Sequence, residues 1–157
     1  MKLDDIDHLL LDELQADAGR TLRELGEVVG LSPSAVQRRV ERYRESGLLS
    51  RTAAVLDPKA SRDLVMAIVL VAIERESPRL LEAFQRRLLA APEVQQLYIC
   101  YGEWDYAVVL TTSGMAHHNE VSTRLFNQSP NVRRFSTMLV LEPLRTGSTN
   151  AARALKL

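Results

Sequence analysis

Ten consecutive residues, Leu64 to Ile73, have the sequence LVMAIVLVAI and include no polar side chain. A transmembrane helix needs about 20 apolar residues, so this run is too short to cross a bilayer. Its branched side chains favour a β-strand. A strand that is apolar at nearly every position has both faces buried, whereas a half-exposed strand alternates apolar and polar residues. The chain is therefore expected to fold around a sheet that contains this strand.

The segments after this strand alternate in type. The patterns predict a helix beginning at Ser77-Pro78 and ending before Pro92, strands from Val94 to Tyr101 and from Tyr106 to Thr112, a helix from Gly114 to Asn127, and a strand from Val132 to Leu141. Two similar stretches, Pro92-Glu-Val94-Gln-Gln and Pro130-Asn-Val132-Arg-Arg, follow the two helices. Strand–helix units repeated in this way predict a ferredoxin-like βαββαβ domain with both helices on one face of the sheet.

This arrangement leaves the second face of the sheet without a cover. Since no further element of the chain is left to supply one, we expect the same face of a second copy to cover it, in a two-fold homodimer. The alternative is that the segment before the first strand folds back over this face.

The first 47 residues have the period of helices. Apolar residues recur at spacings of three and four, which predicts an amphipathic first helix with a stripe of Ile6, Leu9, Leu10 and Leu14. Thr21 and Glu24 have the spacing of a capping box at the start of a second helix, which stops at Gly30. A third helix begins at Ser32 and ends at Gly47.

The third helix is rich in arginine, although the formal net charge of the chain is zero. Five arginines and two glutamates lie between Ser32 and Arg51. At about 100° per residue, Arg38 and Arg42 lie opposite the apolar side of this helix. Three short helices that end in a basic one indicate a helix-turn-helix, whose last helix enters the major groove of DNA. The alternatives are a solvated arginine face on a small bundle and a surface that binds a partner protein.

Double-stranded DNA is therefore the expected partner of this helical region. Arginine can bind phosphate oxygens or guanine edges, and glutamine can bind adenine. The residues expected to contact DNA are Thr21, Ser32, Ser34, Gln37, Arg38, Arg39 and Arg42.

The whole chain resembles the Lrp/AsnC (leucine-responsive/asparagine regulator) family of bacterial and archaeal transcription factors. The resemblance rests on the segment from Leu3 to Leu49, on AVLDP, on GEWDYAVVL and on NVRRFSTMLVLE, which occur in the family's order over nearly the full length. It implies an α+β fold with an N-terminal helix-turn-helix (winged-helix-like) domain and a C-terminal ferredoxin-like domain. It also implies dimers that form through the sheets and assemble further into tetramers or octamers.

The expected domain boundaries follow from this organisation. The helix-turn-helix domain is placed at residues 1–50, a linker at 51–63, the ferredoxin-like ligand-sensing and oligomerisation domain at 64–145, and a C-terminal tail at 146–157. Two features depart from the family: residues 59–63 replace a usual Leu-Gly pair, and the tail is longer than expected and has no assigned function.

Residues 102–106, GEWDY, place two carboxylates on either side of the only tryptophan. By resemblance, this hairpin lies at a contact between dimers and binds a small amino-acid effector. The residues that the resemblance implies at the effector site are Gly102, Glu103, Trp104, Asp105 and Tyr106. The apolar walls are expected from a neighbouring subunit and consist of Met115, Thr137, Met138, Leu139 and Val140. Asp105 is the candidate acceptor for the effector's α-ammonium group. The alternative is a plain hairpin with solvated acids.

An enzymatic function is not expected, and neither a metal nor another cofactor is assigned. Glu103 and Asp105 are placed near solvent, whereas catalytic carboxylate pairs need a raised pKa and room for substrate. The sequence suggests no Ser-His or Cys-His pair for nucleophilic catalysis. The alternative is an enzyme like the sirohaem decarboxylases, which share this two-domain architecture. Those enzymes usually have histidine and arginine around the segment that is YICYGEW here.

The remaining composition suits a cytoplasmic protein. The single cysteine, Cys100, excludes an internal disulfide and is compatible with a reducing compartment. No apolar run is bounded like a signal peptide or long enough for a membrane span, so no membrane partner is expected.

Overall fold

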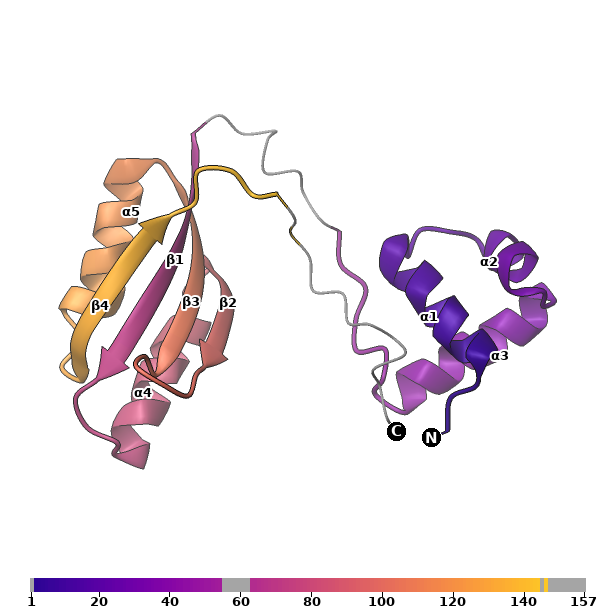
Figure 1. Ribbon diagram of the computed structural model, residues 1–157, viewed down its shortest axis with the longest axis horizontal. Coiled ribbons are helices and arrows are strands. Elements are labelled where there is room, and N and C mark those ends of the chain that lie inside the picture. The colour runs from indigo at the N-terminus through magenta and orange to yellow at the C-terminus, as the bar shows by residue number, and fades with distance from the viewer. Residues whose placement is uncertain (1, 55–62, 145, 147–157) are drawn as a thin grey trace. The chain divides into compact units, whose positions relative to one another are not determined.

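The computed structural model describes residues 2–54, 63–144 and 146. They form two compact units, one of helices and one built on a sheet, and each is described by itself (Figure 1). Most of the expected linker at 51–63 and nearly all of the expected tail at 146–157 lie outside the described residues, so these two expectations stay predictions. None of the helices in the described ranges combines the length and apolar character of a membrane span.

The helical unit consists of α1 (Asp5–Ala16), α2 (Leu22–Val29) and α3 (Pro33–Glu45). Side chains cap each helix at its start, which satisfies backbone N–H groups that have no partner within the helix. Asp4 and Asp7 form a capping box at α1, and Thr21 and Glu24 form the expected one at α2. Ser32 accepts a hydrogen bond from the N–H of Ala35 at the start of α3. All three predicted helices are therefore confirmed.

The core of the helical unit contains apolar side chains from all three helices, namely Leu10, Leu11, Leu25, Val29, Val36, Val40 and Tyr43. The expected stripe on α1 was partly wrong. Leu11 is buried in this core, whereas Leu9 remains 43% exposed. Gly30 ends α2 with a φ of 70°, a left-handed conformation that glycine adopts without steric cost.

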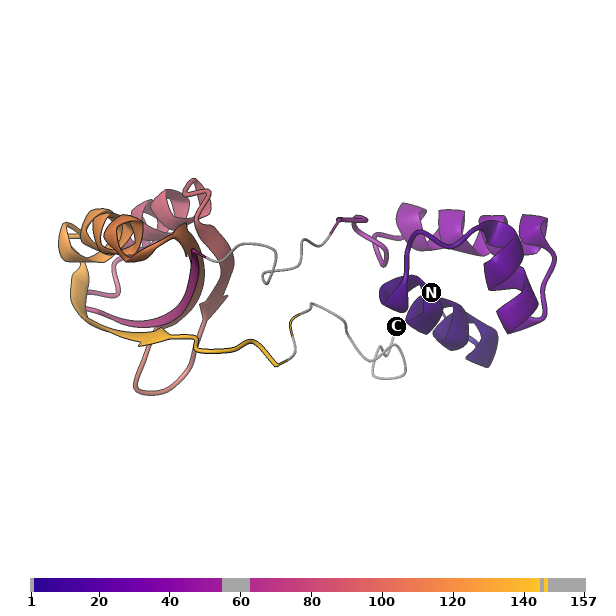
Figure 2. The same cartoon turned by 90° about the horizontal axis from the view of Figure 1, so that it is seen from above.

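The sheet unit has the predicted order of elements. They are β1 (Leu64–Ile73), α4 (Pro78–Leu89), β2 (Val94–Ile99), β3 (Tyr106–Ser113), α5 (Met115–Ser122), the π-helical turn η2 (Thr123–Asn127) and β4 (Val132–Leu139). The sheet is antiparallel with strand order β2-β3-β1-β4. Both helices lie on one face of it (Figure 2). This is the expected ferredoxin-like fold.

The two repeated stretches form the same turn in the structure. The N–H of Val94 donates to the carbonyl of Ala91 at 3.1 Å, and the N–H of Val132 donates to the carbonyl of Ser129 at 3.2 Å. Each turn lies between a helix and the strand that follows it. The sequence repeat therefore corresponds to a structural repeat.

The second helix of the sheet unit is not a single α-helix from 114 to 127. It continues from α5 into η2, where the N–H of Gln128 donates to the carbonyl of Thr123, five residues earlier. The guanidinium of Arg87, on α4, donates to the carbonyl of Leu125 at 2.9 Å. A side chain from the neighbouring helix thus supplies a donor where the regular helical pattern is interrupted.

The two faces of β1 differ in burial within one copy. Val69 and Val71 are fully buried beneath the helices. Met66, Ile68 and Leu70 alternate with them on the opposite face and are half-buried. In the described part of a single chain, the expectation that both faces are buried is thus met on the helix-covered face, whereas on the open face it is met at Ala72. The second-copy cover stays a prediction.

Candidate functional site

The basic face of α3 contains arginines in different environments. Arg38 is exposed, and among the described residues it has no hydrogen-bond or ion-pair partner. The neighbouring polar side chains interact along the helix instead. The Gln37 amide donates to Glu41 at 2.9 Å, and the Ser32 and Ser34 hydroxyls lie 3.1 Å apart. Thr21, at the start of α2, uses its hydroxyl in the capping box.

Arg39 is engaged inside the helical unit, unlike Arg38. Its guanidinium donates to both carboxylate oxygens of Asp4, at 2.9 and 3.0 Å, and also to Asp7. These contacts leave the Arg39 side chain 22% exposed. The structure therefore assigns Arg39 to the contact between α3 and α1, which counts against the predicted contact with DNA.

Asp7 is the centre of this contact. Its side chain is 1% exposed, and Oδ1 accepts hydrogen bonds from Arg42 at 2.6 Å, from the Tyr43 hydroxyl at 2.5 Å, and from Arg39. Burial alone would raise the pKa of Asp7. The hydrogen bonds from Tyr43, from the Asp4 N–H and from Arg39 outweigh burial and hold this pKa at about 2. The carboxylate is thus ionised at neutral pH, although it is buried.

Acid is expected to destabilise the helical unit through Asp7. Its pKa falls from an ordinary 3.8 to about 2, and since one pKa unit is worth about 1.4 kcal/mol, ionised Asp7 contributes roughly 2 kcal/mol to the free energy of unfolding. This contribution is complete above the unfolded-state pKa and is lost as the pH falls from about 4 towards 2. Urea unfolding at several pH values should show the loss, and Asp7→Asn should remove it. A loss of equal size in the variant would contradict the assignment.

The GEWDY segment forms the expected turn between β2 and β3. The N–H of Cys100 donates to the carbonyl of Asp105 at 2.8 Å, which closes the hairpin. The Asp105 carboxylate accepts from the N–H of Ile73 at 2.7 Å, and the Asp105 N–H donates to the carbonyl of Val71. Asp105 therefore ties the hairpin to β1, a structural contact that competes with the predicted role as a ligand acceptor.

Glu103 and Trp104 have a shared partner on β4. The guanidinium of Arg134 donates to Glu103 at 2.8 Å, and its carbon lies 4.2 Å from the centre of the Trp104 ring. Stacking of this kind adds a cation–π attraction to the ion pair. Gly102, at the tip, has a φ of 134°. The hairpin is thus held by a contact with Arg134 of β4 that the sequence did not predict.

Tyr106 does not lie in an open site. It is 2% exposed, its ring packs edge-on against Phe84, and its hydroxyl accepts a hydrogen bond from Gln85 at 2.9 Å. Phe84 and Gln85 belong to α4, so Tyr106 is a core residue beneath that helix. The predicted contact between Tyr106 and an effector is not supported by this position.

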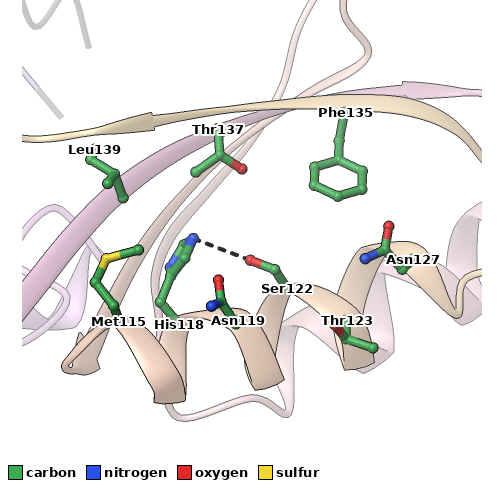
Figure 3. Close-up of a pocket in the computed structure, with 9 residues that line it drawn as sticks. All are labelled: Met115, His118, Asn119, Ser122, Thr123, Asn127, Phe135, Thr137 and Leu139. Carbon is green, nitrogen blue, oxygen red and sulfur yellow. Dashed lines mark hydrogen bonds between the residues drawn. The ribbon is translucent and has the colours of Figure 1, made fainter.

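A groove of about 460 Å³ lies between α5, η2 and β4 (Figure 3). It contains three of the predicted effector residues, Met115, Thr137 and Leu139. The other lining residues, which sequence reasoning missed, are His118, Asn119, Ser122, Thr123, Asn127 and Phe135. Alternation along β4 points Phe135, Thr137 and Leu139 to this side, so the periodicity could have predicted Phe135.

The other predicted effector residues lie elsewhere. Met138 pairs with Ile68 on the opposite face of the sheet, and the N–H of Val140 donates to the carbonyl of Met66. The hairpin contacts the Val71–Ile73 end of β1, whereas Leu139 pairs with Ala67 nearer its other end. One chain therefore does not bring the GEWDY hairpin and the whole groove lining into one site among the described residues.

His118 is a buried histidine in the wall of this groove. It is 4% exposed, and its Nε2 lies 3.2 Å from the Ser122 hydroxyl, while Nδ1 has no partner among the described residues. Burial lowers the pKa of His118, which favours the neutral ring at pH 7. His118 is therefore a packed residue of the groove wall.

A serine and a histidine lie together in the structure, although the sequence suggested no such pair. The Ser113 hydroxyl lies 3.0 Å from Nδ1 of His117, and Nε2 of His117 lies 3.4 Å from Glu93. The backbone N–H of Ser113 also donates to Nδ1, so this nitrogen is already an acceptor. Arg124 pairs with Glu93 at 2.8 Å. These contacts attach α5 and η2 to the start of β2.

Comparison with known proteins covers both units. Residues 3–44 match the AsnC-type helix-turn-helix domain, and residues 66–149 match the Lrp/AsnC ligand binding domain. An HTH-type transcriptional regulator from Sinorhizobium fredii is 32% identical over 92% of this chain and 86% of its own length. The leucine-responsive regulatory protein of Escherichia coli is 27% identical over 91% of this chain and 87% of its own.

A solved structure shows the same fold over nearly the full length. It is a transcriptional regulator from Neisseria meningitidis in complex with L-Met, and it is 26% identical to this chain. The two align with a TM-score of 0.88, which covers 98% of this chain and 100% of the other.

Proposed function

This chain belongs to the Lrp/AsnC family of helix-turn-helix transcriptional regulators, and from that premise we propose how it contacts DNA and where it binds an effector. The observation that carries the proposal is the match of both domains in one chain, together with an exposed arginine on α3. We propose that α3 enters the major groove and that a small amino acid, bound in the groove beside α5, alters the occupancy of DNA sites.

The proposed DNA contacts centre on Arg38. A guanidinium without an internal partner among the described residues loses no protein contact when it binds phosphate or a guanine edge. Ser34, Gln37 and Arg42 lie on the same helix, and Thr21 and Ser32 lie at helix starts, where N–H groups favour phosphate. Arg39 is left out of the proposed set, because its guanidinium is already paired with Asp4 and Asp7.

Arg38→Ala is expected to weaken DNA binding by about 1–3 kcal/mol if Arg38 contacts a base. The measurement is fluorescence anisotropy with a duplex selected from random sequence by the wild-type protein. Arg86→Ala, an equal change of charge on the exposed side of α4, is the matched control and should leave the affinity unchanged. Equal affinities of wild type and Arg38→Ala would reject the proposed contact.

Salt dependence separates DNA binding from the alternative of a protein-binding surface. Contacts with several phosphates release counterions, so affinity for DNA falls steeply as salt is added. The slope of log affinity against log salt concentration should become shallower in Arg38→Ala if Arg38 binds a phosphate. A wild-type affinity that barely changes with salt would favour a partner protein over DNA.

The effector is proposed to bind in the groove between α5 and β4. Met115, Phe135 and Leu139 offer apolar contacts there, and Asn119 and Thr137 offer hydrogen-bonding groups. No Asp, Glu, Lys or Arg is among the described residues that line it. A charged side chain in such a site would lose its hydration without gaining an opposite charge. We therefore propose an amino acid with an apolar side chain, in keeping with the L-Met complex of the Neisseria regulator.

The GEWDY hairpin is proposed to reach this groove from a neighbouring copy. The resemblance to the family implies that the hairpin lies at a contact between dimers. Within one chain, contacts with β1 and β4 hold the hairpin away from Leu139. The hairpin is therefore paired with the groove of a neighbouring copy, and not with the groove of its own chain. The half-buried side chains of Met66, Ile68 and Leu70 support a dimer that forms through the open sheet face.

Thr137→Val is expected to weaken effector binding by about 1 kcal/mol, because it removes a hydrogen-bonding hydroxyl while keeping the shape of the side chain. Calorimetry with L-Met and L-Leu measures this loss, and DNA affinity without effector should not change. Asp105→Ala is a poorer test, since it also breaks the bond to Ile73.

A charged amino acid is the matched ligand control for this site. L-Glu and L-Lys should bind much more weakly than L-Met or L-Leu to the wild-type protein. Equal affinity for L-Lys and L-Met, or an unchanged dissociation constant in Thr137→Val, would place the effector elsewhere.

A further inference from the structure

A buried carboxylate on α1 contacts the arginine face of α3. Oδ1 of Asp7 accepts from Arg42 at 2.6 Å, from the Tyr43 hydroxyl at 2.5 Å and from Arg39, and Oδ2 accepts from the N–H of Asp4 at 3.0 Å. A carboxylate with four donors is fixed in position, and its bonds to arginine are charge-assisted. Asp7 therefore forms a rigid support beneath α3.

Arg42 is the member of this cluster that combines internal support with exposure. One of its terminal nitrogens binds Asp7, and the side chain remains 45% exposed. Its guanidinium carbon also lies 5.6 Å from the centre of the Tyr43 ring. Guanidinium has five N–H donors, and among the described residues Asp7 is the one hydrogen-bonding partner of the Arg42 guanidinium. Donors are thus left over for a second anion.

Arg38 provides a comparison on the same side of α3. It precedes Arg42 by four residues, so the two side chains are neighbours on the helix surface. Arg38 has no hydrogen-bond or ion-pair partner in the described part of the chain, whereas Arg42 is held by Asp7. Two adjacent arginines of equal charge thus differ in how far their orientation is determined before any ligand binds.

We propose that Asp7 is a positioning residue for DNA binding, which holds the Arg42 guanidinium so that its remaining N–H groups bind a DNA phosphate. The inference rests on the proposed contact between α3 and DNA. A side chain that is already ordered loses less conformational entropy when it binds. Asp7 itself carries a negative charge, which repels DNA. Positioning and simple electrostatics therefore predict opposite effects for removal of this charge.

The test is Asp7→Asn in the full-length protein, which keeps the shape of the side chain and removes its charge. We expect DNA affinity to fall by roughly fivefold or more, whereas loss of a negative charge alone would raise it. The measurement is anisotropy with the duplex selected by the wild-type protein. An unchanged or increased affinity would overturn the inference.

Double-mutant cycles identify the residue through which Asp7 acts. Combined with Arg42→Ala, Asp7→Asn should cause little further loss, because the side chain that it positions is gone. Combined with Arg38→Ala, the two losses should add. Additive losses in both cycles would mean that Asp7 acts through the fold of the unit and would overturn the positioning role.

Asp4→Asn is the matched structural control. It weakens the contact between α1 and Arg39, keeps a good N-cap residue, and leaves the bond between Asp7 and Arg42 in place. DNA affinity should therefore fall less than in Asp7→Asn, and an equal fall would count against positioning. Circular dichroism checks that each variant is folded.

Arg42→Lys tests the inference if Asp7→Asn does not fold. It keeps the positive charge but loses the planar guanidinium that Asp7 holds, so affinity should fall several-fold more than in Arg38→Lys. Equal effects of the two lysine variants would overturn the inference. Failure of the proposed function would give a different result. The wild-type protein would then bind no selected duplex, and Arg38→Ala would have no effect.

Discussion

Alanine in place of Gly26 is expected to destabilise the helical unit by about 3 kcal/mol, as a severe case of overpacking, and to abolish DNA binding at moderate protein concentration. The same change in the interior of an exposed helix would gain up to about 1 kcal/mol. At this position, however, a Cβ atom would lie 2.5 Å from the carbonyl oxygen of Leu31. The atom in its way belongs to the backbone of the turn between α2 and α3, which cannot move without displacing α3.

Thermal unfolding followed by circular dichroism should show the loss of stability. Anisotropy with the selected duplex should show the loss of DNA binding. Gly47→Ala is the matched control, because Gly47 has a φ of 74° but open space around it. It should cost about 1 kcal/mol from backbone strain alone. A melting temperature that rises in Gly26→Ala would show that α2 and the turn after it are not in close contact.

Phe126→Ala is expected to lower the stability of the sheet unit by about 3–5 kcal/mol, the usual range for deletion of a buried phenyl ring. Phe126 is 1% exposed, and its ring centre lies 5.3 Å from that of Phe135, which lines the effector groove. Loss of this ring leaves a cavity between η2 and β4. Effector binding should therefore weaken together with stability, because the groove wall loses its support.

Urea unfolding measures the first effect, and calorimetry with L-Met measures the second. Leu89→Ala is the control, because Leu89 is 73% exposed at the end of α4 and its truncation should change stability by about 0.5 kcal/mol or less. If Phe126→Ala were no more destabilising than Leu89→Ala, the assigned core beneath η2 would be wrong. If a destabilised Phe126→Ala variant bound L-Met as tightly as the wild-type protein does, the effector site would lie outside this groove.

Short-range signals in the sequence predicted most of the fold. The capping residues Thr21 and Ser32 mark helix starts, because their side chains supply partners for N–H groups that every helix leaves free. The ten apolar residues of β1 are a strand with the predicted bounds, Leu64–Ile73. The order βαββαβ followed from the change of period along the chain and from the repeated turn.

Contacts between distant segments account for what the sequence did not predict. The end of α5 becomes a π-helical turn, where Arg87 of α4 binds the carbonyl of Leu125. The pairing of Ser113, His117 and Glu93 joins three elements. Tyr106 was placed in an open site because it belongs to the GEWDY motif, yet strand alternation directs it beneath α4.

By itself, the sequence determined the type and order of the helices and strands and where most of them begin, because caps, periodicity and turn residues act over a few positions. It also determined the family, because motifs over nearly the whole chain occur in the right order. Only the tertiary structure decided which charged groups are free. Arg38 and Arg39 are identical neighbours, but their side chains leave the helix about 100° apart. Arg39 meets Asp4 and Asp7, more than thirty residues earlier in the chain, whereas the Arg38 side chain is exposed and has no partner among the described residues. Folding brings Asp4 and Asp7 against α3, and no local sequence pattern predicts that they bind Arg39 and leave Arg38 without a partner among the described residues.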